Sequence, residues 1–207
     1  MNPRRPRPRA MRQAHAWDPH TRAVVQARLA PPSCRFLTPA EQAIAGPLLD
    51  LLTGQAHTPG RVPLLALLDR RLAEGPADGW RHADLPEDAL AWRLSLGALD
   101  AEARLRHRGT GFAGLTTGDR YRLLHVLCTR ARSTLPAPPW HGLPLRHVWE
   151  LWMRHACAAY YSHPLAWDET GFGGPASPRG YVRLGRGTRE VWEAPHPAPT
   201  TPTESPP

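Results

Sequence analysis

The sequence predicts an all-α fold: a single helical bundle of about five helices with a long C-terminal Gly/Pro/aromatic loop and disordered tails. Apolar residues between positions 36 and 161 recur every three or four residues, which is the period of an amphipathic helix. No run of four or more β-branched or aromatic residues alternates with polar ones, so strands are not expected. With 207 residues, 41% of them hydrophobic, the chain can form one domain with its own core.

The first predicted helix lies in "LTPAEQAIAGPLLDLLTG". Thr38 and Glu41 have the spacing of a capping box, and Pro39 takes the first helical position, where proline is favoured. Gly54 can end the helix. Pro47 inside it should kink or split the helix, because proline lacks the backbone N–H and clashes with the preceding turn.

Two further helices are predicted at 61–74 and 84–108, the second capped by Asp84 with Glu87 three residues later. The helix at 84–108 has two apolar faces. One holds Leu90, Leu94, Ala98, Ala101 and Leu105. The other holds Trp92, Leu96 and Leu99. Two apolar faces are typical of a central helix that is covered on both sides.

The last two helices are predicted at about 116–132 and 144–161. Apolar residues surround most of the first of these, so we expect it to be interior as well. The second has one apolar side that includes Trp149 and Trp152, which fit a core stripe as well as a partner-facing one.

The charge is concentrated at the N-terminus. All 26 basic residues are arginines, and residues 1–35 hold eight of them against a single acid. Residues 36–207 are almost neutral, so the body lacks the basic face that a nucleic-acid-binding domain needs. We therefore divide the chain into a basic Pro/Arg-rich tail at 1–35, a helical domain at 36–193 and a disordered Pro/Thr tail at 194–207.

Cysteine usage and hydropathy indicate the compartment. The three cysteines are odd in number and have no metal-clip spacing, which favours a reducing compartment. No apolar stretch is long enough for a transmembrane helix, so no direct membrane insertion is expected. Arg4-Arg5 lacks the apolar stretch of an export signal, which favours a cytoplasmic location.

Motifs for catalysis or cofactor binding are weak. "GTGFAG" at 109–114 has the glycine spacing of a dinucleotide site, but a helix precedes it where the site requires a strand. The eleven histidines show no ligand spacing on a helix, and no nucleophile elbow is present. We expect no catalytic residue, cofactor or metal in this chain. A stand-alone enzyme using His163, Asp168 and Glu169 is the alternative.

The segment from Tyr160 to Tyr181 is the most unusual part of the sequence. It combines aromatic rings, glycines, prolines and one arginine without a helical or strand period. Aromatic and arginine residues are enriched at interface centres, and glycine lets the main chain approach a partner closely. The candidate partner surface comprises Trp149, Trp152, Tyr160, Tyr161, His163, Pro164, Trp167, Asp168, Gly171, Phe172, Gly173, Gly174, Arg179 and Tyr181.

The motif "YYSHPLAWDETGFGGPASPRGYVRL", together with "FLTPAEQAIAGPLLDLL", resembles the subunit 3 (small, or gamma) family of gluconate 2-dehydrogenase over about residues 35–185. The resemblance implies a small helical partner of a large flavin-dependent oxidoreductase of the glucose–methanol–choline type. The large subunit would hold FAD, and the small one would help it to fold, take up flavin and stay soluble. A cytochrome subunit, and export of the whole complex to the periplasm, remain open.

The main hypothesis is therefore a non-catalytic subunit whose Trp167, Phe172 and Tyr181 anchor in apolar pockets of the large chain, while Arg179 pairs with a carboxylate or carbonyls there. The alternatives are the stand-alone enzyme and a nucleic-acid-associated protein that acts through the Arg-rich N-terminal tail.

Overall fold

The computed structural model describes residues 7–58, 62–75, 81–133, 140–176 and 180. Within these residues the fold is all-α, as predicted, with seven α-helices, two 3-10 helices and no strand. The chain divides into two compact units. Ala30–Ser162 form the larger unit, and Met1–Leu29 with His163–Pro207 form the smaller one. The division at residue 162 falls inside the domain that the sequence placed at 36–193.

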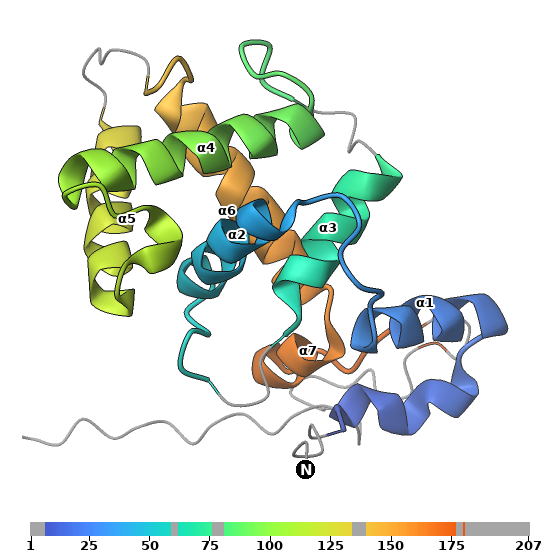
Figure 1. The fold of residues 1–207 in the computed structure, drawn as a ribbon. Helices are drawn as coiled ribbons and strands as arrows, with labels where there is room; N and C mark the ends of the chain where they lie inside the picture. The colour runs from blue at the N-terminus through green and yellow to red at the C-terminus, as the bar shows by residue number, and fades with distance from the viewer. Residues whose placement is uncertain (1–6, 59–61, 76–80, 134–139, 177–179, 181–207) are drawn as a thin grey trace, which may run out of the picture. The chain divides into compact units, whose positions relative to one another are not determined.

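The larger unit contains all five helices predicted from periodicity. They are α2 (Pro39–Leu52), α3 (Leu64–Glu74), α4 (Asp88–Arg106), α5 (Thr117–Arg132) and α6 (Leu145–Tyr161), with the short 3-10 helix η2 (Phe112–Gly114) before α5. The central helix is α6, which packs against α2, α3, α4 and α5 (Figure 1). Its Val148, Trp152 and Ala156 are fully buried, so the unit's core lies along this helix.

The helix starts follow local chemistry. Thr38 caps α2 through a capping box with Glu41, as expected. Pro47 was expected to kink or split this helix, and the split is wrong, because α2 continues to Leu52, while the kink stays a prediction. Leu48 and Leu49 are fully buried just after the proline, so their packing supports the second half of the helix.

The expected cap at Asp84 is also wrong, because α4 begins only at Asp88. Pro86 gives the physical reason, since the residue before a proline avoids helical geometry. Leu85 occupies that position and is buried ahead of the helix.

The prediction that α4 is covered on both sides is wrong for the described residues. Trp92, Leu96 and Leu99 are fully buried. Leu90, Leu94 and Leu105 are 50%, 46% and 76% exposed. Hydrophobic periodicity shows which faces are apolar, but it does not show that a neighbouring helix exists for each of them.

The smaller unit contains η1 (Arg9–Ala16), α1 (Pro19–Leu29) and α7 (Pro164–Thr170). Residues 9–29 were expected to be part of a disordered tail, and in the structure they are helical. The reason lies in the small and apolar residues between the arginines: Ala10, Met11, Trp17 and Val25 form a buried cluster with Trp167. Residues 194–207 lie outside the described residues.

In the described part of the chain, none of the helices combines the length and the apolarity needed to cross a lipid bilayer.

Candidate partner-binding surface

The aromatic segment expected to be an irregular loop contains a helix, α7. Pro164 occupies its first turn, and the Leu165 amide donates to Nδ1 of His163 at 3.2 Å. Gly171 ends the helix with φ +73°, in the left-handed region that glycine adopts readily. The helix is too short to show periodicity, but proline at its start and glycine after its end could have revealed it.

Trp167, an expected anchor for the partner, lies inside the chain. Only 5% of this residue is exposed, and it packs with Met11, Trp17 and Val25 of the N-terminal segment. The Phe172 ring lies edge-on to it, with 5.3 Å between ring centroids. In this arrangement Trp167 holds the segment in place from within, and it does not present its ring on the surface.

Glycine 174 makes a close approach, but to the chain itself. Its φ is +92°, and a Cβ atom at this position would lie 3.0 Å from Nε2 of Gln13 and 3.1 Å from Cζ2 of Trp17. The Trp17 indole N–H donates to the Pro175 carbonyl at 3.0 Å. Both backbone conformation and space therefore require glycine here.

Asp168 also connects the two halves of the smaller unit. Its carboxylate oxygens accept from the Arg9 backbone N–H at 3.0 and 3.1 Å. No local sequence pattern could indicate this contact, because the two residues are 159 positions apart. In the stand-alone enzyme hypothesis Asp168 and His163 act together, and the structure instead shows each of them bonded to a backbone N–H group.

The remaining residues of the candidate surface differ in exposure. Tyr161 and Phe172 are 55% and 47% exposed. The half-buried members are Trp149, Tyr160, Asp168 and Gly171. The buried members are Trp152, His163, Pro164, Trp167, Gly173 and Gly174. Arg179 and Tyr181 lie outside the described residues.

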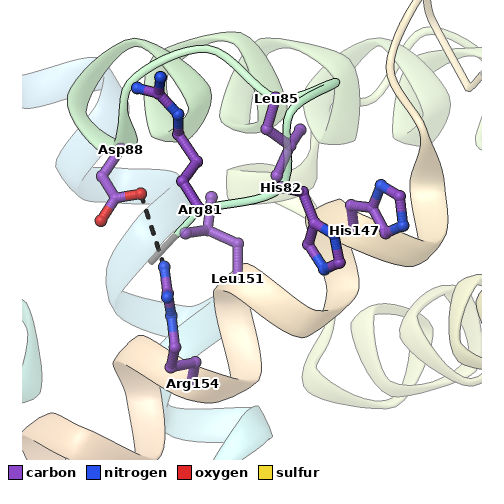
Figure 2. Close-up of a pocket in the computed structure, with 7 residues that line it drawn as sticks. All are labelled: Arg81, His82, Leu85, Asp88, His147, Leu151 and Arg154. Atoms are coloured by element: carbon purple, nitrogen blue, oxygen red, sulfur yellow. Dashed lines mark ion pairs between the residues drawn. The ribbon is translucent and has the colours of Figure 1, made fainter. Parts of the chain in front are cut away.

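The larger unit has a small hollow beside α6 (Figure 2). It is lined by Arg81, His82, Leu85, Asp88, His147, Leu151 and Arg154. Its interior measures about 10 Å³, which is close to the space that one water molecule needs. An organic substrate or a flavin does not fit in it.

The histidines at this hollow invite comparison with a metal site. Ligand atoms of His82, Asp84 and His147 lie within 4.8 Å of one another. However, the two imidazole rings stack, with centroids 3.7 Å apart and planes 8° apart. Two imidazoles on one tetrahedral Zn²⁺ at about 2.0 Å would hold their centroids about 5 Å apart, because each ring must point at the metal in its own plane.

Hydrogen bonds account for both rings. Nδ1 of His147 lies 2.8 Å from Oδ1 of Asp84, and Nε2 of His82 lies 2.7 Å from Oε2 of Glu150. Burial raises the pKa of Glu150, but hydrogen bonds from Arg146 and His82 outweigh it and leave the pKa below its usual value. We interpret the cluster as a polar clamp that holds the segment before α4 against α6.

A second polar contact supports this clamp. Figure 2 shows Arg154 reaching toward Asp88, with 3.6 Å between Nη2 and Oδ1. Nε2 of His155 lies 3.2 Å from the other oxygen of Asp88, and Nδ1 of His155 accepts from the Trp92 indole N–H at 2.8 Å. These contacts run from the first turn of α4 into the buried core of α6.

Comparison with known proteins identifies the family. The model of the family described as gluconate 2-dehydrogenase subunit 3 matches residues 39–174, which is more than half of the chain. The match begins at the first residue of α2 and ends at Gly174, so the N-terminal helices η1 and α1 lie outside it. No curated protein and no solved structure matches the chain. The chain therefore belongs to the gluconate 2-dehydrogenase subunit 3 family.

Proposed function

We propose that this chain is the non-catalytic small subunit of a flavin-dependent sugar or alcohol dehydrogenase complex. Its task is to bind and stabilise a large FAD-containing subunit of the glucose–methanol–choline type. Family membership carries this proposal, since the family is described as a subunit of gluconate 2-dehydrogenase. The FAD and the substrate site belong to the large subunit, and this chain contributes surface and not redox chemistry.

Phe172 is the residue through which we propose to test the contact. Its ring is 47% exposed and packs perpendicular to the buried Trp167 ring, so part of it contacts the chain and part faces solvent. A partly exposed aromatic ring is typical of an interface anchor, because aromatic residues are enriched among those that contribute most to binding. Arg179 and Tyr181 stay predicted contacts with the partner, and so does Tyr161 of the larger unit.

The complex is proposed to be cytoplasmic, and assistance in folding and flavin uptake is proposed as the benefit to the large subunit. In obligate complexes the two subunits typically bury about 2,000 Å² or more of surface between them, and we expect an interface of that order here. Such a subunit has apolar surface that must be covered before it is stable in water.

The test is affinity capture of the tagged full chain from its own cells, followed by a flavin absorbance spectrum of the captured protein. We expect a flavoprotein to be retained by the wild-type chain, and to be retained more than tenfold less well by Phe172→Ala. The matched control is Val24→Ala, which shortens another exposed apolar side chain of the same unit (39% exposed). Capture of no flavoprotein, or turnover of a sugar by the isolated chain without flavin, would contradict the proposal.

A further inference from the structure

The N-terminal helices η1 and α1 cover Trp167, the neighbour of the proposed anchor Phe172. We call residues 9–29, which contain both helices, the N-terminal plug. Among the described residues, every other buried member of the apolar cluster around Trp167 belongs to the plug. Phe172 packs perpendicular to the same Trp167 ring, and 47% of it is exposed. One ring of this aromatic pair is therefore open to a partner, and the plug closes off the other.

The plug is held in shape by contacts of its own. At the start of α1, the Asp18 carboxylate accepts from the Thr21 backbone N–H at 3.0 Å, which caps the helix. Arg22 of α1 reaches back to the end of η1. Its guanidinium donates, at 2.9 to 3.3 Å, to the backbone carbonyls of Ala14, His15 and Trp17. These bonds join the two helices to each other, so the plug can leave α7 as one piece.

A short hinge connects the plug to the larger unit. Residues 31–35 contain no helix, strand or turn. Asp69 fixes the chain from there on, because its carboxylate accepts from the backbone N–H groups of residues 35–37. A stretch of this kind between two ordered elements can absorb a hinge movement. The family match begins at Pro39 and includes α7, so the covered helix lies inside the family unit and its cover lies outside.

Opposite charges favour docking of the plug on α7. The plug holds four arginines and one acid, whereas α7 holds two acids and no basic residue. The Arg9 backbone N–H donates to the Asp168 carboxylate at 3.0 and 3.1 Å, and the Trp17 indole N–H donates to the Pro175 carbonyl at 3.0 Å. The bond to Asp168 is exposed, so water replaces it at little cost when the plug leaves. The contact is therefore specific and also reversible.

We propose that the N-terminal plug is an autoinhibitory contact. In the free chain it covers Trp167, and it leaves when the large flavoprotein subunit binds, so that Trp167 and Phe172 form the anchor together. The inference rests on the proposed function and adds regulation of the same surface. The closed plug keeps apolar surface of the free chain out of water. It also weakens partner binding in proportion to the share of chains that are closed.

Two adjacent valines of α1 provide matched variants of the full chain. Val25 is 2% exposed and belongs to the cluster around Trp167, whereas Val24 is 39% exposed. Val25→Asp should release the plug, because a carboxylate buried against Trp167 is unfavourable, and Val24→Asp should leave the plug in place. An arginine-specific protease should therefore cut within residues 9–29 at least about tenfold faster in Val25→Asp than in Val24→Asp.

The decisive measurement is the affinity of these variants for the flavoprotein recovered with the wild-type chain. We expect Val25→Asp to lower Kd at least about tenfold relative to Val24→Asp, because no plug has to be displaced. Damage to the fold would raise Kd instead, so the direction of the change identifies the mechanism. Trp17→Ala, which removes the bond to Pro175 without adding charge, should also lower Kd. It decides alone if Val25→Asp loses its helical circular dichroism.

The outcomes separate this inference from the proposed function. If Phe172→Ala weakens flavoprotein binding but neither release variant tightens it, the plug inference is overturned and the proposed function stands. Weaker binding in both folded release variants would also overturn it, because the plug would then be part of the interface. Protease resistance of the plug in both variants would overturn it as well. If no flavoprotein binds the wild-type chain or either release variant, both proposals fail.

Discussion

Glu102 of α4 offers a direct test of how the larger unit is stabilised. Its side chain is only 9% exposed, and its two oxygens receive four contacts. One oxygen accepts from Arg106 Nε at 2.6 Å and lies 3.5 Å from Arg130 Nη1. The other accepts from the Trp140 indole N–H at 3.2 Å and lies 3.0 Å from His141 Nε2.

Glu102→Gln keeps the shape of the side chain but replaces one of these oxygens by an NH₂ group. Whichever way the amide turns, a donor then faces either Arg106 or the Trp140 indole N–H, and at least one partner loses its acceptor. A hydrogen bond to a charged group contributes about 1.5–3 kcal/mol, and solvent around the half-exposed arginines reduces their share. We expect a loss of about 2–4 kcal/mol in the free energy of unfolding.

The assay is urea unfolding followed by far-UV circular dichroism at neutral pH. The matched control is Glu74→Gln, since Glu74 also lies near two arginines, Arg35 at 3.9 Å and Arg70 at 4.0 Å, but its side chain is 49% exposed. We expect that control to change stability by less than about 1 kcal/mol. Equal losses in the two variants would refute the argument that burial makes the Glu102 contacts strong.

The pH dependence of the Glu102→Gln difference follows from the same contacts. Burial raises the pKa of Glu102, but hydrogen bonds from Arg106 and His141 outweigh it, so the folded-state pKa lies below the usual value. A carboxylate with a depressed pKa contributes its full stability above its unfolded pKa of about 4.3. The advantage of the wild-type chain should therefore be complete at neutral pH and shrink as the pH falls below about 4. An undiminished difference in strong acid would contradict this assignment.

Three further predictions concern other contacts. Gly174→Ala should lower the free energy of unfolding of the smaller unit by about 1–3 kcal/mol, because Gly174 has a positive φ and a Cβ there would lie 3.0 Å from Gln13. Residues 9–29 should then be cleaved faster by a protease, and unchanged cleavage would contradict the prediction. Trp167→Ala should make the same segment more sensitive to protease, because the cavity it leaves should lower the free energy of unfolding by about 3–5 kcal/mol. Protection equal to that of the wild type would refute the core role of Trp167. The buried carboxylate of Asp69 accepts from the backbone N–H groups of residues 35–37 at 2.6 to 3.2 Å. Asp69→Asn should therefore lower the melting temperature markedly, and a decrease of less than about 2 °C would count against the importance of these hydrogen bonds.

Periodicity and end signals made the larger unit predictable. Five helices were identified because each repeats apolar residues over three or more turns, and Thr38 supplied a capping box that the structure retains. The predicted start of α4 was too early because Pro86 disfavours helical geometry at the preceding residue. The exposure of Leu90, Leu94 and Leu105 could not be predicted, because the sequence shows that a face is apolar without showing what covers it.

The smaller unit was mostly missed, for two physical reasons. α7 and η1 are too short to show an amphipathic period, and the many arginines around Ala10, Met11 and Trp17 make that segment hydrophilic on average. The contacts of these residues with Trp167 and Gly174 join segments about 160 positions apart, which no local pattern can reveal. The sequence located the unusual aromatic segment correctly, but it did not show that Trp167, Gly173 and Gly174 are buried in the chain's own packing.

The central claim is that this chain acts by binding a flavoprotein, and co-elution tests it most directly. The full chain and its captured partner would be passed over a size-exclusion column with simultaneous detection of protein and flavin absorbance. We predict that the chain elutes with a larger protein in one flavin-containing peak, and that Phe172→Ala moves the chain, still folded, to a later flavin-free peak. A wild-type chain that elutes alone as a stable, colourless monomer would contradict the claim.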